Sequence, residues 1–247
     1  SDSFGIYQFT YRRPGDRDQS AWFQAKRPGS YDFQIQWERL QHTYSTDARS
    51  PGLENSPLGF NTLPTPRPDS TAWRNAPYIG DIRTVWDPMK ATLGLTPSVN
   101  VDVLAEYLRT TKLGGIPNSI SFNGSSGPQR EFVSPVNQTT SEFRLSHSFT
   151  SPALTHPEGY SPIKSYQFTV AYEYSRFQNA LTSVMVDNPM QAVNSSTLGA
   201  ATSRLSLAPN NSAHSASFVG AVALPWGSRL TGSVATSWQY QNDAGYR

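Results

Sequence analysis

Residues 31–38 read Tyr31-Asp32-Phe33-Gln34-Ile35-Gln36-Trp37-Glu38, with an aromatic or aliphatic residue at every odd position and a charged or amide residue at every even one. Successive side chains of a β-strand point to opposite faces, so this pattern predicts a strand with one apolar and one wet face. The same alternation runs through residues 166–174 and 230–240. Weaker copies cover residues 5–11, 21–26, 89–95, 99–107, 143–149 and 216–224. We therefore expect an all-β fold of about nine strands.

The connections between the expected strands alternate in length. We expect short turns at residues 27–30, 96–98 and 225–228, where Pro, Gly and Ser favour turn dihedrals. Long loops, rich in Pro, Ser, Asn, Gly and Thr, are expected near residues 41–88, 110–142 and 181–215. The intermediate connection 150–163 falls on the short-turn rim, and the brief connection 13–18 falls on the long-loop rim. Tight turns on one rim and long loops on the other are typical of an antiparallel up-and-down transmembrane β-barrel.

A soluble β-sandwich also has strands with one buried and one wet face. Two features favour the barrel: Tyr and Trp near strand ends suit a membrane interface, and the polar faces are hydrophilic over nearly the whole strand. These polar faces include Asp32, Gln34, Gln36, Glu38, Thr231, Ser233, Ser237, Gln239 and Gln241. We expect them to line a lumen.

The expected strand number bears on whether the chain closes a barrel alone. Bacterial single-chain barrels have an even number of strands, and an open sheet edge cannot exist in hydrocarbon. The chain starts at Ser1 without an initiator Met, and residues 242–247 resemble the start of a loop. We therefore expect residues 1–247 to be a single segment of a larger barrel.

The composition argues against several kinds of site. The chain has no cysteine, which excludes disulfides, Cys-ligated zinc, iron–sulfur clusters and covalently attached c-type haem. A net charge of +2 gives no signal for nucleic-acid binding. The four histidines, expected as surface or lumen residues, are His42, His147, His156 and His214.

Catalytic motifs are also missing from the sequence. There is no metal-binding histidine spacing, nucleophile elbow, P-loop or dinucleotide fingerprint. We expect no catalytic, cofactor-binding or metal-binding residue, and hence no enzyme. The acidic residues of the strand faces are expected to solvate the lumen or contact a partner: Asp32, Glu38, Asp102, Glu106 and Glu173.

Several short stretches, in this order and spacing, resemble the MtrB/PioB family of decahaem-associated outer-membrane proteins. They are Gly29-Ser30-Tyr31-Asp32-Phe33, Asp81-Ile82-Arg83-Thr84, Val186-Asp187-Asn188-Pro189, residues 207–214 and 224–232, and Gln241-Asn242-Asp243. The resemblance covers about residues 29–243. Pro209-Asn210-Asn211 departs from the family, which more often has Pro-Asp-Asn there.

This resemblance implies a barrel in the bacterial outer membrane that holds a periplasmic decahaem c-type cytochrome. In such a porin–cytochrome complex the haems of the partner carry electrons across the membrane, and the system supports extracellular electron transfer. The implied partners are a multihaem cytochrome inserted in the barrel and the lipid bilayer, with no nucleic acid. A diffusion porin with an open lumen and a soluble carbohydrate-binding β-protein are the alternatives.

Overall fold

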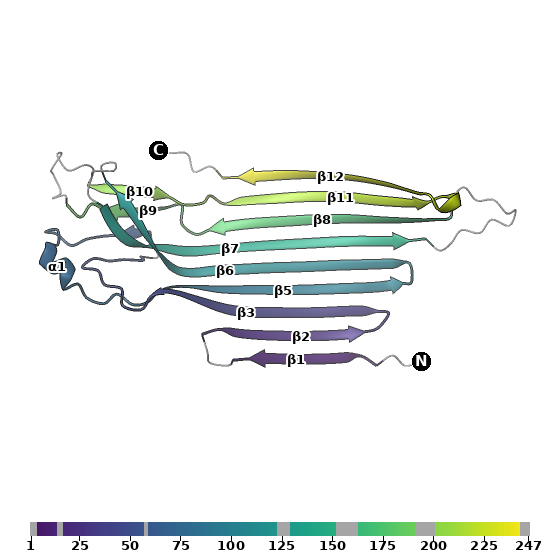
Figure 1. Cartoon of the computed structure of the whole chain (residues 1–247), viewed down its shortest axis with the longest axis horizontal. Helices are drawn as coiled ribbons and strands as arrows, with labels where there is room; N and C mark the ends of the chain where they lie inside the picture. Colours follow the sequence, from purple (N-terminus) through teal and green to yellow (C-terminus); the bar gives the residue numbers. More distant parts are fainter. Residues whose placement is uncertain are drawn as a thin grey trace.

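The computed structural model describes residues 4–13, 17–56, 59–122, 129–151, 163–190 and 201–242. Within these ranges nine antiparallel strands form one sheet in the order β1-β2-β3-β5-β6-β7-β8-β11-β12 (Figure 1). Their bounds are β1 Ile6–Arg12, β2 Gln19–Arg27, β3 Tyr31–Ser45, β5 Ile82–Ser98, β6 Val101–Ser121, β7 Gln129–Thr150, β8 Ser165–Asn179, β11 Asn211–Ala223 and β12 Arg229–Gln241. The nine predicted strands and the all-β class are thus confirmed. Strands β1 and β12 form the two edges of an unclosed sheet, as in a segment of a larger barrel.

The turns match the predictions at two of three places. The β2–β3 turn lies at residues 28–30, and the predicted turn before β12 contains a short 3-10 helix, Pro225–Gly227. The turn expected at residues 96–98 lies instead at residues 99–100, because β5 continues to Ser98 with a bulge between Leu95 and Ser98. Pro97 lies within this bulge, since proline has no N–H to donate to the ladder.

The segments expected as long loops contain regular structure. Residues 110–121 and 129–142 belong to β6 and β7, so the loop predicted at 110–142 is wrong apart from residues 123–128, which lie outside the described ranges. Segment 41–88 contributes to β3 and β5 and contains β4 (Phe60–Asn61) and helix α1 (Ser70–Arg74). Segment 181–215 contains β9 (Ser183–Asp187), β10 (Thr202–Ser206) and the start of β11.

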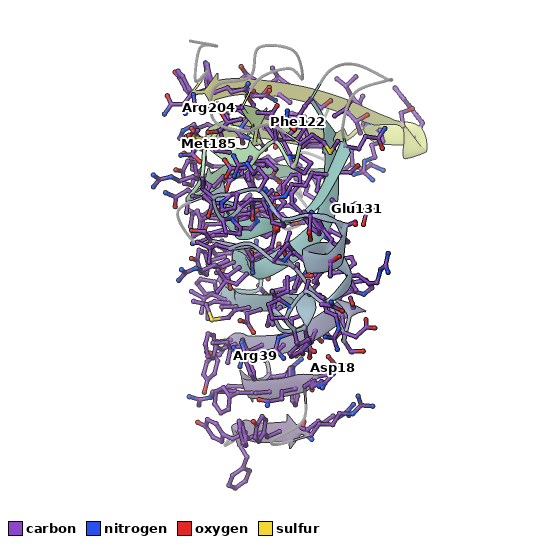
Figure 2. All side chains as sticks on the ribbon, turned by 90° about the vertical axis from the view of Figure 1, so that its left-hand side faces the viewer. Asp18, Arg39, Phe122, Glu131, Met185 and Arg204 are labelled. Carbon is purple, nitrogen blue, oxygen red and sulfur yellow. The ribbon has the colours of Figure 1, made fainter. Side chains whose placement is uncertain are left out.

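The register gathers the alternating residues onto two contrasting faces. One row of paired residues crosses the sheet through Tyr31, Leu95, Val103, His147, Val170, Phe218 and Val234. We call the side of the sheet that carries this row the apolar face. A row on the opposite side, the polar face, runs through Gln24, Gln34, Thr92, Glu106, Arg144, Glu173, Ser215 and Ser237. Seen along the strands, side chains project from both sides of the sheet (Figure 2).

The apolar face is not covered by other described parts of the chain. Val170, Phe218 and Val234 are 46%, 43% and 64% exposed. In a β-sandwich this face would pack against a second sheet. The exposed face instead fits a surface that contacts lipid.

The buried apolar cluster lies at the end of the sheet where β3 leads to β5 and β6 to β7. There β4, β9 and β10 form a second sheet in the order β10-β9-β4, beside the extended ends of β6 and β7 (Figure 1). We call this sheet, together with residues 46–56 and 59–81, the cap. Val184 and Val186 of β9 are fully buried against Phe132 of β7. Among the described residues, no helix has the length and apolar character needed to cross a membrane.

Candidate functional site: the polar face and the cap

The polar face begins with a hydrogen-bonded group around Asp32. Because Lys26 pairs with Asp32 across the β2–β3 ladder, its Nζ lies 2.9 Å from Asp32 Oδ2. Gln24 and Gln34 donate from Nε2 to Asp32 Oδ1 at 3.1 and 3.2 Å. Further along β3, Gln36 donates to Glu38 at 2.8 Å. The polar side chains predicted along residues 31–38 therefore form two hydrogen-bonded groups on one face, one around Asp32 and one that joins Gln36 to Glu38.

The middle of the polar face carries a run of alternating charges. Lys90 Nζ lies 3.2 Å from Glu106 Oε1, and Arg144 Nε lies 3.3 Å from Glu173 Oε1. Glu106 and Arg144 are also register partners, which brings the two pairs side by side. Such solvated pairs contribute only about 0–1 kcal/mol each to stability. Their main consequence is a charged, hydrated surface that spans four neighbouring strands.

This part of the face is hollowed. A cavity of about 470 Å³ is lined by Lys90, Glu106, Arg144, Glu173, Ser237 and Gln239, among others. The predicted lumen residues of β12 belong to the same face, because Ser237 pairs with Ser215 and Ser215 with Glu173. The structure thus brings Glu106, Glu173 and Ser237 together, although they lie far apart in the sequence.

Two of the four histidines expected on the surface or in the lumen lie on the uncovered apolar face. His147 and His214 lie on the apolar face, since each continues the apolar alternation of its strand. The His147 ring stacks on Phe168 with centroids 6.1 Å apart, and His214 Nδ1 lies 2.8 Å from the Tyr172 hydroxyl. His42 contacts an aromatic ring, Tyr44, and His156 lies outside the described residues. In the described part of the chain no three potential ligands group around a metal position.

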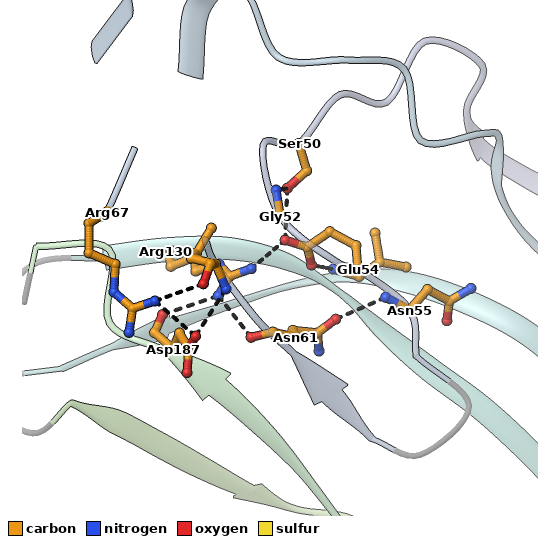
Figure 3. Close-up of polar contacts among 10 residues, drawn as sticks. Ser50, Gly52, Glu54, Asn55, Asn61, Arg67, Arg130 and Asp187 are labelled. Atoms are coloured by element: carbon orange, nitrogen blue, oxygen red, sulfur yellow. Dashed lines mark hydrogen bonds and ion pairs between the residues drawn. The ribbon is translucent and has the colours of Figure 1, made fainter. Parts of the chain in front are cut away.

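A buried ion pair joins the cap to β7 (Figure 3). The side chains of Arg130 and Glu54 are 1% and 3% exposed and contact each other through Arg130 Nη2 and Glu54 Oε1. Glu54 also accepts from the Val133 backbone N–H at 3.2 Å and from Ser50 Oγ at 3.0 Å. Arg130 Nη1 donates to the Asn61 carbonyl at 3.0 Å. Residues from β4, β7 and the segment before β4 are therefore fixed to one another.

A second ion pair extends this network to β9. Asp187 Oδ2 accepts from Arg67 Nη1 at 3.0 Å and from the Leu63 backbone N–H at 2.9 Å (Figure 3). The Asp187 carbonyl accepts from Arg130 Nη1 at 3.1 Å. This network was not predicted from the sequence. The alternation of Val184 and Val186 within a polar segment was the available signal for β9, but the partners of the Asp187 carboxylate, Arg67 and Leu63, are more than a hundred residues away.

The comparison with family models matches residues 2–246 to the outer membrane beta-barrel porin family MtrB/PioB. No curated protein matches the sequence.

Proposed function

Since the chain belongs to the MtrB/PioB family of outer-membrane β-barrel porins, we propose that it forms part of the wall of a sheath around a multihaem c-type cytochrome. The family places the chain in the bacterial outer membrane. In this proposal electrons cross the membrane through haems held inside the barrel. The barrel supplies burial, orientation and electrical insulation, and the redox chemistry belongs to the partner.

The polar face is the observation that carries this proposal. Its charges come in both signs and are partly solvated, as in Lys90 with Glu106 and Arg144 with Glu173. A soluble protein inserted in the lumen needs such a surface, because its own exterior is polar and must keep its hydrogen bonds. A chain without cysteine has no thiol for haem attachment, so the haems must be supplied by the partner.

The orientation in the membrane follows from the two faces. We infer that the apolar face, including Tyr166, Phe168, Val170, Tyr172 and Tyr174, contacts lipid, and that Gln167, Thr169 and Glu173 face the lumen. Outer-membrane barrels have short periplasmic turns and longer extracellular connections. The turns before β3 and β12 then lie in the periplasm, and the cap lies outside the cell.

A diffusion porin with an open lumen is the second candidate, favoured by the hydrated hollow of the polar face. The soluble carbohydrate-binding alternative is set aside by the family membership. The two remaining candidates differ in what fills the lumen.

The test is purification of the complete protein from its native membrane in mild detergent, followed by haem staining and reconstitution into liposomes. We expect a haem protein to copurify and the complex to reduce an acceptor on the far side of the membrane. Arg144→Glu would place like charges beside Glu106 and Glu173 and should weaken the complex, whereas Arg204→Glu, on the exposed surface of the cap, should not. A haem-free protein that conducts small solutes would refute the sheath and support the diffusion porin.

A further inference from the structure

Two arginines share one row of the apolar face near the cap end of the sheet. Arg109 of β6 and Arg176 of β8 both pair with Ser141 of β7, so they lie two strands apart on the same side. Neighbouring strands are about 4.8 Å apart, which puts the two backbones about 10 Å apart. Both arginines are exposed.

Neither guanidinium has an ion-pair partner in the described part of the chain. Arg39 and Arg144 differ in this respect, because Arg39 Nε lies 2.8 Å from Asp87 Oδ1 and Arg144 Nε lies 3.3 Å from Glu173 Oε1. The complete row reads Tyr11, Ala21, Trp37, Met89, Arg109, Ser141, Arg176, Ser212 and Tyr240, without a carboxylate. The row of Arg109 and Arg176 therefore exposes two positive charges and contains no carboxylate that could neutralise them.

The rows on either side of the arginines show where the apolar surface ends. The adjacent row toward the short turns contains Phe9, Phe23, Ile35, Ala91, Tyr107, Phe143, Tyr174, His214 and Trp238. The adjacent row toward the cap contains Asp87, Thr111, Thr139 and Gln178. Aromatic girdles mark the membrane interface in outer-membrane barrels. Arg109 and Arg176 thus lie at the depth of lipid headgroups.

We propose that Arg109 and Arg176 bind the headgroup of an outer-leaflet lipid that carries two phosphates. A guanidinium binds phosphate through two parallel N–H bonds, and a separate phosphate for each arginine matches their spacing. The hydroxyls of Ser141 and Ser212 lie in the same row and can donate to the headgroup. The acyl chains then lie along the aromatic row beneath. This inference rests on the proposed orientation, in which the cap end is outside.

The test measures lipid binding by native mass spectrometry of the complete protein in detergent. The probes are a bisphosphorylated lipid A, its monophosphorylated form, phosphatidylglycerol and inorganic phosphate. We expect the wild-type protein to prefer the bisphosphorylated lipid, and Arg109→Gln with Arg176→Gln to lower its affinity at least about tenfold, as the loss of two charge-assisted contacts implies. Arg229→Gln is the control: Arg229 begins β12 at the short-turn end of the sheet, opposite the cap end, and this variant should bind lipid like the wild type. Heat-modifiable migration on gels verifies that each variant is folded.

Three outcomes would overturn the inference: equal lipid binding by the double variant, equal binding of the one-phosphate probes by the wild type, or loss of binding in Arg229→Gln alone. Cytochrome copurification is measured on the same samples. The double variant should keep its haem partner, so failure of lipid binding and failure of the sheath are separate results.

Discussion

Placing an arginine at Val170 tests which face of the sheet contacts lipid. Val170 lies midway between Tyr166 and Tyr174 on the apolar face of β8, and its register partners are His147 and Phe218. The centre of this face should lie near the bilayer midplane, where an outward-facing Arg costs about 2–4 kcal/mol. That cost corresponds to a roughly 30-fold to 700-fold lower ratio of folded to unfolded protein.

The neighbouring residue supplies the matched control. Thr169 lies on the polar face, and its hydroxyl is 2.9 Å from that of Ser148. Thr169→Arg loses this hydrogen bond, worth about 1 kcal/mol, but keeps its charge in the lumen. Urea unfolding of the complete protein in lipid vesicles, followed by tryptophan fluorescence, measures both variants. Equal destabilisation by the two substitutions, or a larger effect at Thr169, would refute the assignment of the apolar face to lipid.

Four other outcomes are expected. Protease added to intact cells should cut, if anywhere, near Pro64 or near Gly124, which lies outside the described residues. It should not cut at the short turns around Pro28–Gly29, Pro97–Ser98 or Trp226–Gly227. The reverse pattern of cleavage would show that the topology is inverted. Glu54→Ala leaves the Arg130 guanidinium buried without its carboxylate and should destabilise the cap by about 3–5 kcal/mol. Adding Arg130→Met should reduce this loss of stability. Hydrogen exchange of cap peptides measures both variants, and normal protection in Glu54→Ala would contradict the role of the ion pair. Gly114→Ala should destabilise the β5–β6 pairing, since its Cβ would lie 2.1 Å from the Arg83 carbonyl oxygen at a φ of +130°. Gly232→Ala is the control, because a Cβ there meets nothing within 4 Å. Equal urea midpoints for the two variants would contradict the predicted clash at Gly114. The hydrogen bond from Tyr78 to Asp81 raises the pKa of Tyr78. The contribution of this hydrogen bond to cap stability should therefore be complete below the ordinary tyrosine pKa of about 10 and disappear as the pH rises through the raised pKa. An ultraviolet titration of the wild type against Tyr78→Phe checks the direction of the pKa shift.

The sheet could be predicted because one face of each strand is apolar and the other polar. Residues 31–38 and 166–174 show this alternation clearly, and both stretches are strands in the structure. The extension of β7 could not be found in this way. Its residues 132–136 are buried on both faces, between β9 and the segment around Glu54, so hydrophobic and small residues follow one another without alternation.

The polar face could be predicted from local alternation, whereas its ion pairs and the contacts of the cap could not. Alternation within a strand predicts that Glu106 and Glu173 lie on a polar face, but only the register shows that Arg144 lies between them. Arg130 and Glu54 are 76 residues apart and meet only because the cap folds back on β7. Gly114 lies in the segment 110–142 that was predicted to be a loop, and the structure shows that it accommodates the close approach of the Arg83 backbone. These contacts depend on tertiary structure and leave no local signal.

In the proposed orientation, the length of the β6–β7 hairpin determines what an approaching antibody or bacteriophage would meet first. The pairing of β7 with β8 ends at Gln138, whereas β7 begins at Gln129, so about nine residues, or roughly 30 Å, continue beyond the neighbouring strand. The cap is attached to this extension. With the cap end outside, as proposed, the cap is the most outward part of the described chain, and the rim of the sheet lies below it, closer to the membrane. Substitutions that evade recognition should therefore gather on the exposed side of the cap, where they leave the strand pairing and both faces of the sheet unchanged.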